Sequence, residues 1–278
     1  MSKTTMRILC LLVLILLTLP KASAQRVQLA PRDQKPKPAA STESAASKFF
    51  DAVKAGHIDL VRRLLQEDPA LVNVKGKAGD TPLHVAVDAE QGKIVGLLLT
   101  KNADVNAKNE IEETPLHVAA SGDQVVIAVL LLASKADVNA ADISGNTPLH
   151  MAMSKEMAEL LVTKGGNVAA RNDDELTPLH TAVDRHKTGV VEYLLTHHAD
   201  VNAKNKEGNT PLHALMDATI EEDAESAWSD WMKEMAELLL ANRADVNAKN
   251  NEGLTPLMIA IKLKNKGAIE LLRKHEAK

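Results

Sequence analysis

Histidine is the residue type whose repetition in this chain could support chemistry. The chain contains ten histidines, and imidazole is both a common metal ligand and a general base. His186, His197 and His198 do not recur in a pattern. The others include five that end the tetrapeptide Thr-Pro-Leu-His, namely His84, His117, His150, His180 and His213. A shared site would need these side chains close together, so the elements that carry them decide the question.

The tetrapeptide recurs at nearly constant intervals. Its copies start at Thr81, Thr114, Thr147, Thr177 and Thr210, and Thr-Pro-Leu-Met starts at Thr255, so the successive spacings are 33, 33, 30, 33 and 45 residues. The string Ala-Asp-Val-Asn-Ala returns in phase with it from residues 103, 136, 199 and 244, with a degenerate copy at 166–170. A fixed period of this kind indicates a repeat architecture.

The sequence pattern of each repeat predicts two helices and a turn. Threonine can cap a helix N-terminus, and proline fits the first helical position, where its missing N–H is not needed. A second helix follows with paired leucines, as in residues 94–99, 126–132 and 190–195. The segment before the next threonine has no helical period and often contains a glycine, which suits a turn with positive φ, at Gly79, Gly145, Gly208 and Gly253.

These motifs resemble those of the ankyrin repeat family over about residues 45–278. The resemblance implies an all-α repeat solenoid of stacked helix-turn-helix ankyrin repeats with β-turn fingers. About seven repeats fill residues 48–278, with starts near 45, 78, 111, 144, 174, 207 and 252, and the first, which lacks the tetrapeptide, caps the N-terminus. In the family the histidine is a structural hydrogen-bonding residue. Stacked helices are roughly 10 Å apart, too far to share a metal ion with bonds near 2 Å.

Several positions depart from the repeat pattern. Glu112 and Glu175 replace the finger glycine, so we expect these two fingers to be strained or differently turned. The 30-residue repeat joins its two helices through a link that is three residues short. The 45-residue repeat carries an insertion at 217–232, which holds Trp228, Trp231 and a run of acidic residues. Two interpretations stay open: the insertion lengthens the helix pair and packs its tryptophans, or it is a recognition element, where tryptophan is enriched.

The resemblance also implies where a partner binds: at the finger tips and the exposed positions of the first helices. The corresponding candidate residues are Ile111, Glu112, Ile143, Ser144, Asp173, Asp174, Asp184, Arg185 and Glu207, together with Trp228 and Trp231 of the insertion. Ile111 and Ile143 are the best hydrophobic anchors. The surface is predominantly acidic, so we expect the partner to be another protein of basic character.

No pattern in the sequence predicts an enzyme. A nucleophile motif, P-loop, dinucleotide fingerprint or HExxH is not found, so we expect no catalytic residue, metal site or cofactor. The pair His197-His198 could bind a divalent ion, although a solvated turn is favoured. The leading hypothesis is a non-catalytic protein-interaction scaffold. The alternatives are a metal-binding or small-ligand-binding protein and an exported effector or antagonist.

The N-terminus predicts export. Lys3 and Arg7 precede an apolar run over residues 8–19, and Ala22-Ser23-Ala24 is a small-x-small cleavage signature, so residues 1–24 are expected to be a signal peptide cleaved after Ala24. The run is short for the roughly 20 residues of a membrane-spanning helix. We therefore expect a secreted or periplasmic protein. Residues 25–47, rich in Pro, Ser, Ala and Lys, are expected to be a disordered linker.

Cleavage would leave an acidic chain without cysteine. It removes three basic residues and no acidic one, which makes the formal charge of −4 more negative by three, and it removes Cys10, the one cysteine. An acidic chain is a poor match for nucleic acid or an anionic membrane, so neither is expected as a partner. A chain without cysteine forms no disulfide, and its stability must come from packing.

Overall fold

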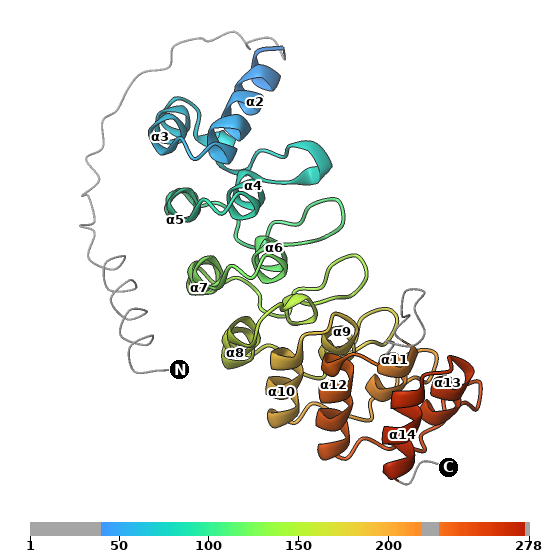
Figure 1. Ribbon diagram of the computed structural model, residues 1–278. Helices are drawn as coiled ribbons and strands as arrows, with labels where there is room; N and C mark the ends of the chain where they lie inside the picture. Colours follow the sequence, from blue (N-terminus) through green and yellow to red (C-terminus); the bar gives the residue numbers. More distant parts are fainter. Residues whose placement is uncertain (1–39, 218–227, 276–278) are drawn as a thin grey trace, which may run out of the picture. The chain divides into compact units, whose positions relative to one another are not determined.

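The structure is a computed structural model that describes residues 40–217 and 228–275. These residues form seven successive helix pairs, stacked so that the first helices make one row and the second helices another (Figure 1). The pairs are α2 (Ala40–Lys54) with α3 (Ile58–Glu67), α4 (Pro82–Asp88) with α5 (Gly92–Thr100), α6 (Pro115–Ser121) with α7 (Val125–Ala133), η3 (Pro148–Met151) with α8 (Lys155–Thr163), α9 (Pro178–Asp184) with α10 (Thr188–Thr196), α11 (Pro211–Asp217) with α12 (Asp230–Ala241), and α13 (Pro256–Lys262) with α14 (Lys266–Lys274). Two short 3₁₀ helices, η1 (Pro69–Asn73) and η2 (Lys77–Gly79), join α3 to α4. We call α2–α3 the cap pair and the following pairs repeats 1 to 6.

The helix starts follow the predicted capping chemistry. In repeat 1, Thr81 and His84 form a capping box, in which each side chain bonds the backbone of the other residue, and Pro82 occupies the first helical position. Repeats 2, 3 and 4 have the same box. This arrangement satisfies N–H groups at the helix start that have no partner inside the helix.

The third repeat is the exception among the first helices. Its first helix, η3, is a single 3₁₀ turn of four residues, whereas the first helices of the other repeats are α-helices of seven residues. The three residues missing from this repeat are therefore lost from the first helix as well as from the link that the sequence analysis expected to be short.

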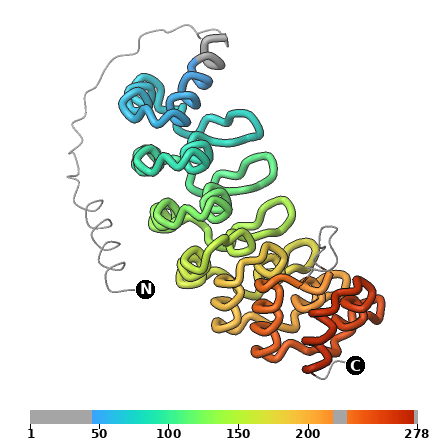
Figure 2. The backbone as a smooth tube through the Cα atoms, viewed as in Figure 1, coloured from blue at the N-terminus to red at the C-terminus, as the bar shows by residue number. Residues whose placement is uncertain are grey.

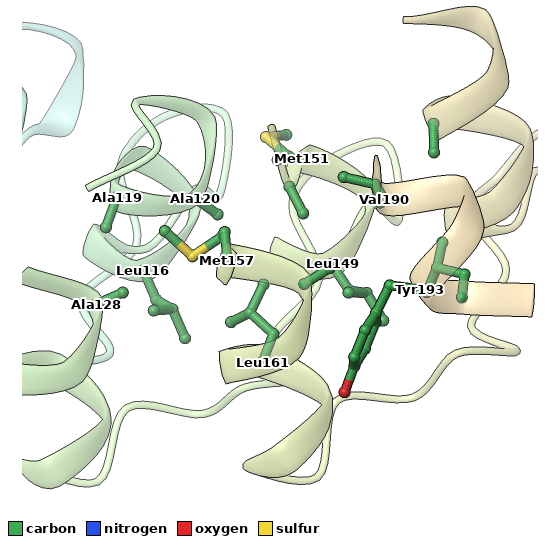
Figure 3. Close-up of a cluster of buried hydrophobic side chains, with 14 of the residues drawn as sticks. Leu116, Ala119, Ala120, Ala128, Leu149, Met151, Met157, Leu161, Val190 and Tyr193 are labelled. Carbon is green, nitrogen blue, oxygen red and sulfur yellow. The ribbon is translucent and has the colours of Figure 1, made fainter. Parts of the chain in front are cut away.

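The core is continuous along the stack, as expected for repeats that bury their apolar faces only against neighbours. The leucine of each tetrapeptide is fully buried or nearly so, at Leu83, Leu116, Leu149, Leu179 and Leu212. Figure 3 shows how Leu116, Leu149, Met157 and Leu161 from successive repeats pack side by side. The stacked helix pairs and this shared core confirm the all-α repeat solenoid.

Between repeats, the chain forms loops that project from one side of the stack (Figure 2). We call these loops the fingers. The side chain of an asparagine or aspartate stabilises the turn in each of the five fingers that follow repeats 1 to 5. In the finger after repeat 1, the Asn109 side chain accepts hydrogen bonds from the backbone N–H groups of Ile111 and Glu113. Asp142, Asn172, Asn205 and Asn250 make the same pair of bonds. Such local bonds are the usual reason that asparagine and aspartate favour turns.

The two fingers without glycine keep the shape of the others. Glu112 and Glu175 have φ values of 58° and 56°, close to the 75° to 78° of the glycines at the same position. The expectation of a different turn is therefore wrong, whereas strain is present, because a residue with a Cβ pays a cost in this region. Each glutamate forms an exposed ion pair with a residue four positions earlier in the same finger: Glu112 with Lys108, and Glu175 with Arg171.

Two segment boundaries differ from those expected. Helix α2 begins at Ala40, inside the segment that the sequence analysis assigned to a disordered linker ending at residue 47, and Phe49 and Val53 anchor this helix in the core. The insertion expected at 217–232 is narrower, because Asp217 ends α11 and residues 230–232 form the first turn of α12, with Met232 buried. The expected signal peptide, linker residues 25–39 and insertion residues 218–227 lie outside the described residues. Among the helices described, none is long and apolar enough to cross a membrane.

Candidate partner-binding surface

The finger tips form one continuous row because each is bonded to the next through the backbone. The N–H of Ile143 donates to the carbonyl of Ile111 over 2.9 Å, and the N–H of Asp173 donates to the carbonyl of Ser144 over 2.9 Å. Equivalent bonds join Glu110 to Ala78, Lys206 to Asp174 and Asn251 to Glu207. Residues predicted from the sequence as separate tips are thus brought side by side.

Two neighbouring tips present large apolar side chains to solvent. Ile111 is 51% exposed and Ile143 is 59% exposed. Neither side chain is needed for the core, since both project from loops. Exposed apolar groups placed next to each other on a rigid element are a common feature of binding surfaces. A further exposed apolar residue, Val126, lies on the second-helix row and is 65% exposed.

A pocket of about 250 Å³ lies between the first two fingers and the first helices behind them. Its acidic lining comes from Asp80 and Glu113, which each precede the threonine of a tetrapeptide, and from Asp88 at the end of α4. The remaining lining residues are His84, Val85, Asn109, Val118 and Ser121. The position before the repeated threonine was missed in the sequence analysis as part of the site. It is recognisable only once the finger residues and the first helices are known to line the same pocket.

The pocket favours a positive charge. Burial raises the pKa of the Glu113 carboxyl, and the carboxylates of Asp142 and Asp80 raise it further. Carboxylates that destabilise one another in this way are relieved by a cation placed between them. The pocket is therefore suited to the head group of a lysine or arginine side chain.

The five repeated histidines are structural. In repeat 1, Nδ1 of His84 accepts the N–H of Thr81, which leaves Nε2–H to donate to the carbonyl of Glu113 in the next finger over 3.0 Å. The other four make the same pair of bonds, and their Nε2 atoms lie 3.0 to 3.2 Å from carbonyls of Asn146, Leu176, Asn209 and Leu254. Both ring nitrogens are thereby engaged.

Burial keeps these histidines neutral. It lowers the pKa of His84, His117, His150 and His213, and lowers that of His180 to about 4, while the bond to the neighbouring carbonyl opposes the shift in part. Desolvation disfavours the charged imidazolium. The rings therefore link the repeats as neutral groups.

The other predicted surface residues lie where the resemblance implied. Glu112, Ser144, Asp173, Asp174 and Glu207 are exposed on the fingers. Asp184 ends α9 and Arg185 caps it, both exposed. The structure brings the finger residues into one row with Ile111 and Ile143, and places Asp184 and Arg185 on the first-helix row of repeat 4.

The two tryptophans pack against neighbouring repeats. Both are partly buried on the hydrophobic core. The Trp231 ring packs against His186 of repeat 4 with centroids 3.7 Å apart and the ring planes tilted by 31°. Trp228 contacts repeat 6 so closely that a Cβ on Gly267 would overlap its ring. Each tryptophan thus joins repeat 5 to a different neighbour, which favours the packing interpretation of the insertion.

In the remaining histidine pair, the side chain of His197 has structural contacts of its own. The ring of His197 stacks on that of Tyr193, and its Nδ1 lies 2.8 Å from the Tyr193 carbonyl. In the part of the chain that the structure describes, no three His, Cys, Asp or Glu side chains are grouped as metal ligands.

Models of ankyrin repeats match most of the chain. Models for many copies match residues 97–152, 161–214 and 232–273, a three-copy model matches 46–109, and a single-repeat model matches 144–173 and 207–251. The chain belongs to the ankyrin repeat family, whose repeats serve as protein-interaction scaffolds. Among curated proteins it is similar to "Ankyrin repeat and SAM domain-containing protein 6" of Rattus norvegicus, with 37% identity over 68 residues. That match covers 24% of this chain and 8% of the relative.

Proposed function

We propose that this protein is a non-catalytic scaffold that binds a basic segment of another protein outside the cytoplasm. The observation that carries the proposal is the juxtaposition of the exposed Ile111 and Ile143 with the acidic pocket of Asp80, Asp88 and Glu113. An apolar anchor on the finger tips and a lysine or arginine in the pocket would be recognised together. Burial of the apolar side chains supplies affinity, and charge complementarity supplies selectivity.

The proposed location rests on the N-terminal sequence. The basic residues, apolar run and small-x-small motif of residues 3–24 are typical of a cleaved export signal. Sequencing the N-terminus of the protein recovered from the periplasm or medium tests this directly. Gln25 is the expected first residue. Recovery of a chain that retains Met1 in the cytoplasm would contradict the proposed location.

Partner capture with matched variants tests the proposed surface. The chain from Gln25 would be immobilised as the unaltered protein, as the Ile111→Ser/Ile143→Ser double variant and as Val126→Ser. We expect one or a few basic proteins to bind the unaltered protein and the Val126→Ser variant. The amount captured by the double variant should be at least tenfold lower. Capture of the same proteins by all three forms would contradict the assignment of the surface, since Val126 is an equally exposed apolar residue elsewhere.

A further inference from the structure

The loops that follow the second helices are joined along the stack by asparagine side chains. Asn106, after α5, accepts the N–H of Asp137 over 2.8 Å and donates to the carbonyl of Lys135 over 3.3 Å in the next loop. Asn73, Asn139 and Asn202 each make the same two bonds to the loop that follows theirs. We call these four paired contacts the asparagine links.

One link is missing between repeats 3 and 4. The corresponding residue in the loop after α8 is Ala169, which is exposed and has no side-chain donor or acceptor. Its counterpart in the next loop, the N–H of Asp200, receives no bond from it. Among the described residues, no hydrogen bond joins the loop of residues 164–170 to the loop of residues 197–203, although just past both loops the Arg171 guanidinium donates to the carbonyl of Lys204 over 2.7 Å. The stack is therefore held differently at this junction.

Two further features coincide with the missing link. Repeat 3 is the one whose first helix is a single 3₁₀ turn. In addition, the axes of α4 to α8 run toward the viewer in Figure 1, whereas those of α10, α12 and α14 run down the page. The direction of the second helices thus changes between α8 and α10, at the junction that lacks the asparagine.

The contacts that remain are unequal on the two sides of the junction. On the first-helix side, the carbonyl of Leu176 accepts from His150 over 3.0 Å, and the hydroxyl of Thr181 donates to the carbonyl of His150 over 3.1 Å. On the second-helix side, Lys155 and Glu192 form an exposed ion pair of 3.2 Å. Exposed pairs of this kind contribute little.

The chain's one tyrosine also lies on the second-helix side. Tyr193 of α10 is buried in the cluster drawn in Figure 3, which also holds Leu161 of α8. At the same helical position, Leu97, Leu130, Leu160 and Leu238 occupy the other repeats. Its hydroxyl bonds Thr163 of α8 and its ring stacks on His197 of its own helix end, and its remaining contacts are apolar. Apolar contact is non-directional and tolerates small rotations that hydrogen bonds resist.

We propose that the domain bends at the junction between repeats 3 and 4, so that residues 45–163 and 177–275 move as two blocks. The bonds of His150 and Thr181 keep the first-helix side closed and act as the hinge. The second-helix side is the side that moves, since α10 packs on α8 through buried apolar side chains, the Tyr193 hydroxyl bond and an exposed ion pair, without the asparagine link of the other junctions. The inference does not depend on the proposed function, because it concerns the solenoid itself.

Distance distributions between spin labels test the proposal. Because Cys10 is the one cysteine of the chain and lies in the expected signal peptide, the chain from Gln25 can be labelled through introduced cysteines alone. The exposed last residues of α3, α7, α10 and α14, namely Glu67, Ala133, Thr196 and Lys274, give three matched pairs that are each two repeat steps, about 20 Å, apart. The pair Ala133–Thr196 spans the junction, and Glu67–Ala133 and Thr196–Lys274 do not.

We expect the distribution for Ala133–Thr196 to be about twice as wide as the other two. Ala169→Asn, which supplies the missing side chain, should narrow it. Asn106→Ala, which removes an existing link, should widen the distance distribution of the pair Glu67–Ala133 and leave that of the pair Ala133–Thr196 unchanged. A distribution across the junction that is no wider than its neighbours would overturn the hinge. An unchanged width in Ala169→Asn would overturn the missing link as its cause.

Discussion

At the scale of single residues, the repeated histidine shows how a chemically versatile side chain is committed to structure. His84 and its four counterparts are buried, and each uses Nδ1 to cap the start of its own helix and Nε2 to bond a carbonyl of the next finger. A buried ring that lost one of these bonds would leave an unsatisfied polar group, which costs more than the bond itself contributes. The same neutrality that suits this role makes the stack sensitive to acid.

We expect the free energy of unfolding to fall between pH 7 and pH 4. The pKa of each repeated histidine is lowered in the fold, to about 4 for His180, so the unfolded chain binds more protons than the folded chain below about pH 6.5. The stability contributed by each ring is complete above that pH and is lost as the pH falls toward the folded value, by up to about 1.4 kcal/mol per pH unit.

Urea denaturation at several pH values measures this loss. The exposed His57 supplies the control, because His57→Gln removes a histidine that makes no bond between repeats and should leave the pH dependence unchanged. If the free energy of unfolding were constant from pH 7 to pH 5, the buried histidines would have to be protonated in the folded state, and their assigned bonds would be wrong.

At the scale of elements, the sequence predicted the types of element better than their lengths. The helix pairs and the fingers follow from local rules, since Thr-Pro starts a helix and an asparagine or aspartate bonds its own turn. The 3₁₀ turn at Pro148–Met151 could not be predicted, because it depends on how much length the short repeat can lose and still reach its neighbour. The retained turn at Glu112 depends likewise on its neighbours, which hold Ile111 in place through a backbone bond from Ile143.

For the insertion, we expect loss of Trp231 to weaken the contact between repeats 4 and 5. Trp231→Ala removes a partly buried ring that packs against His186, and should lower the free energy of unfolding by about 1–3 kcal/mol, less than for a fully buried tryptophan. Chemical denaturation measures the change. Trp231→Phe keeps a ring at the same place and should recover most of it.

The contact of Trp228 is tested by a substitution in its neighbour, repeat 6. Gly267→Ala places a methyl group where the Trp228 ring lies, so the ring must move, and its fluorescence emission should shift to longer wavelength. If Trp231→Ala left the stability unchanged and Gly267→Ala left the emission unchanged, the tryptophans would not fasten repeat 5 to its neighbours, and the recognition interpretation of the insertion would regain support.

At the scale of the whole molecule, the period of 33 residues indicated a repeat architecture, and the resemblance of the repeated motifs to ankyrin repeats was enough to predict the solenoid. The acidic pocket was harder to predict, because Asp80, Asp88 and Glu113 are separated in the sequence and meet only where two neighbouring fingers and two first helices line one pocket. The missing link at Ala169 is visible as a degenerate copy of Ala-Asp-Val-Asn-Ala. Its consequence requires knowledge of the bonds that the asparagine makes elsewhere.

A linear stack predicts sharply different costs for core and surface changes. Leu194 is fully buried, so Leu194→Ala should lower the free energy of unfolding by about 2–5 kcal/mol. Ile143 is exposed on a finger, so Ile143→Ser should change it by no more than about 0.5 kcal/mol. Denaturation curves of the two variants give the comparison. Equal costs would mean that Ile143 packs in the core and is unavailable to a partner.

The bonds made by the repeated histidines have a consequence for how such a chain can change its length. The partner carbonyl lies 29 residues ahead of the histidine in three repeats, 26 ahead for His150 and 41 ahead for His213, yet the contact stays between 3.0 and 3.2 Å. The shortening removes the end of the first helix and part of the link after it, and the lengthening falls between α11 and α12, so both lie outside the fingers and outside the loops with the asparagine links. Insertions and deletions at that point leave the register between neighbouring repeats intact. It is therefore the place in each repeat where new segments can accumulate, or be grafted, without disturbing the rest of the stack.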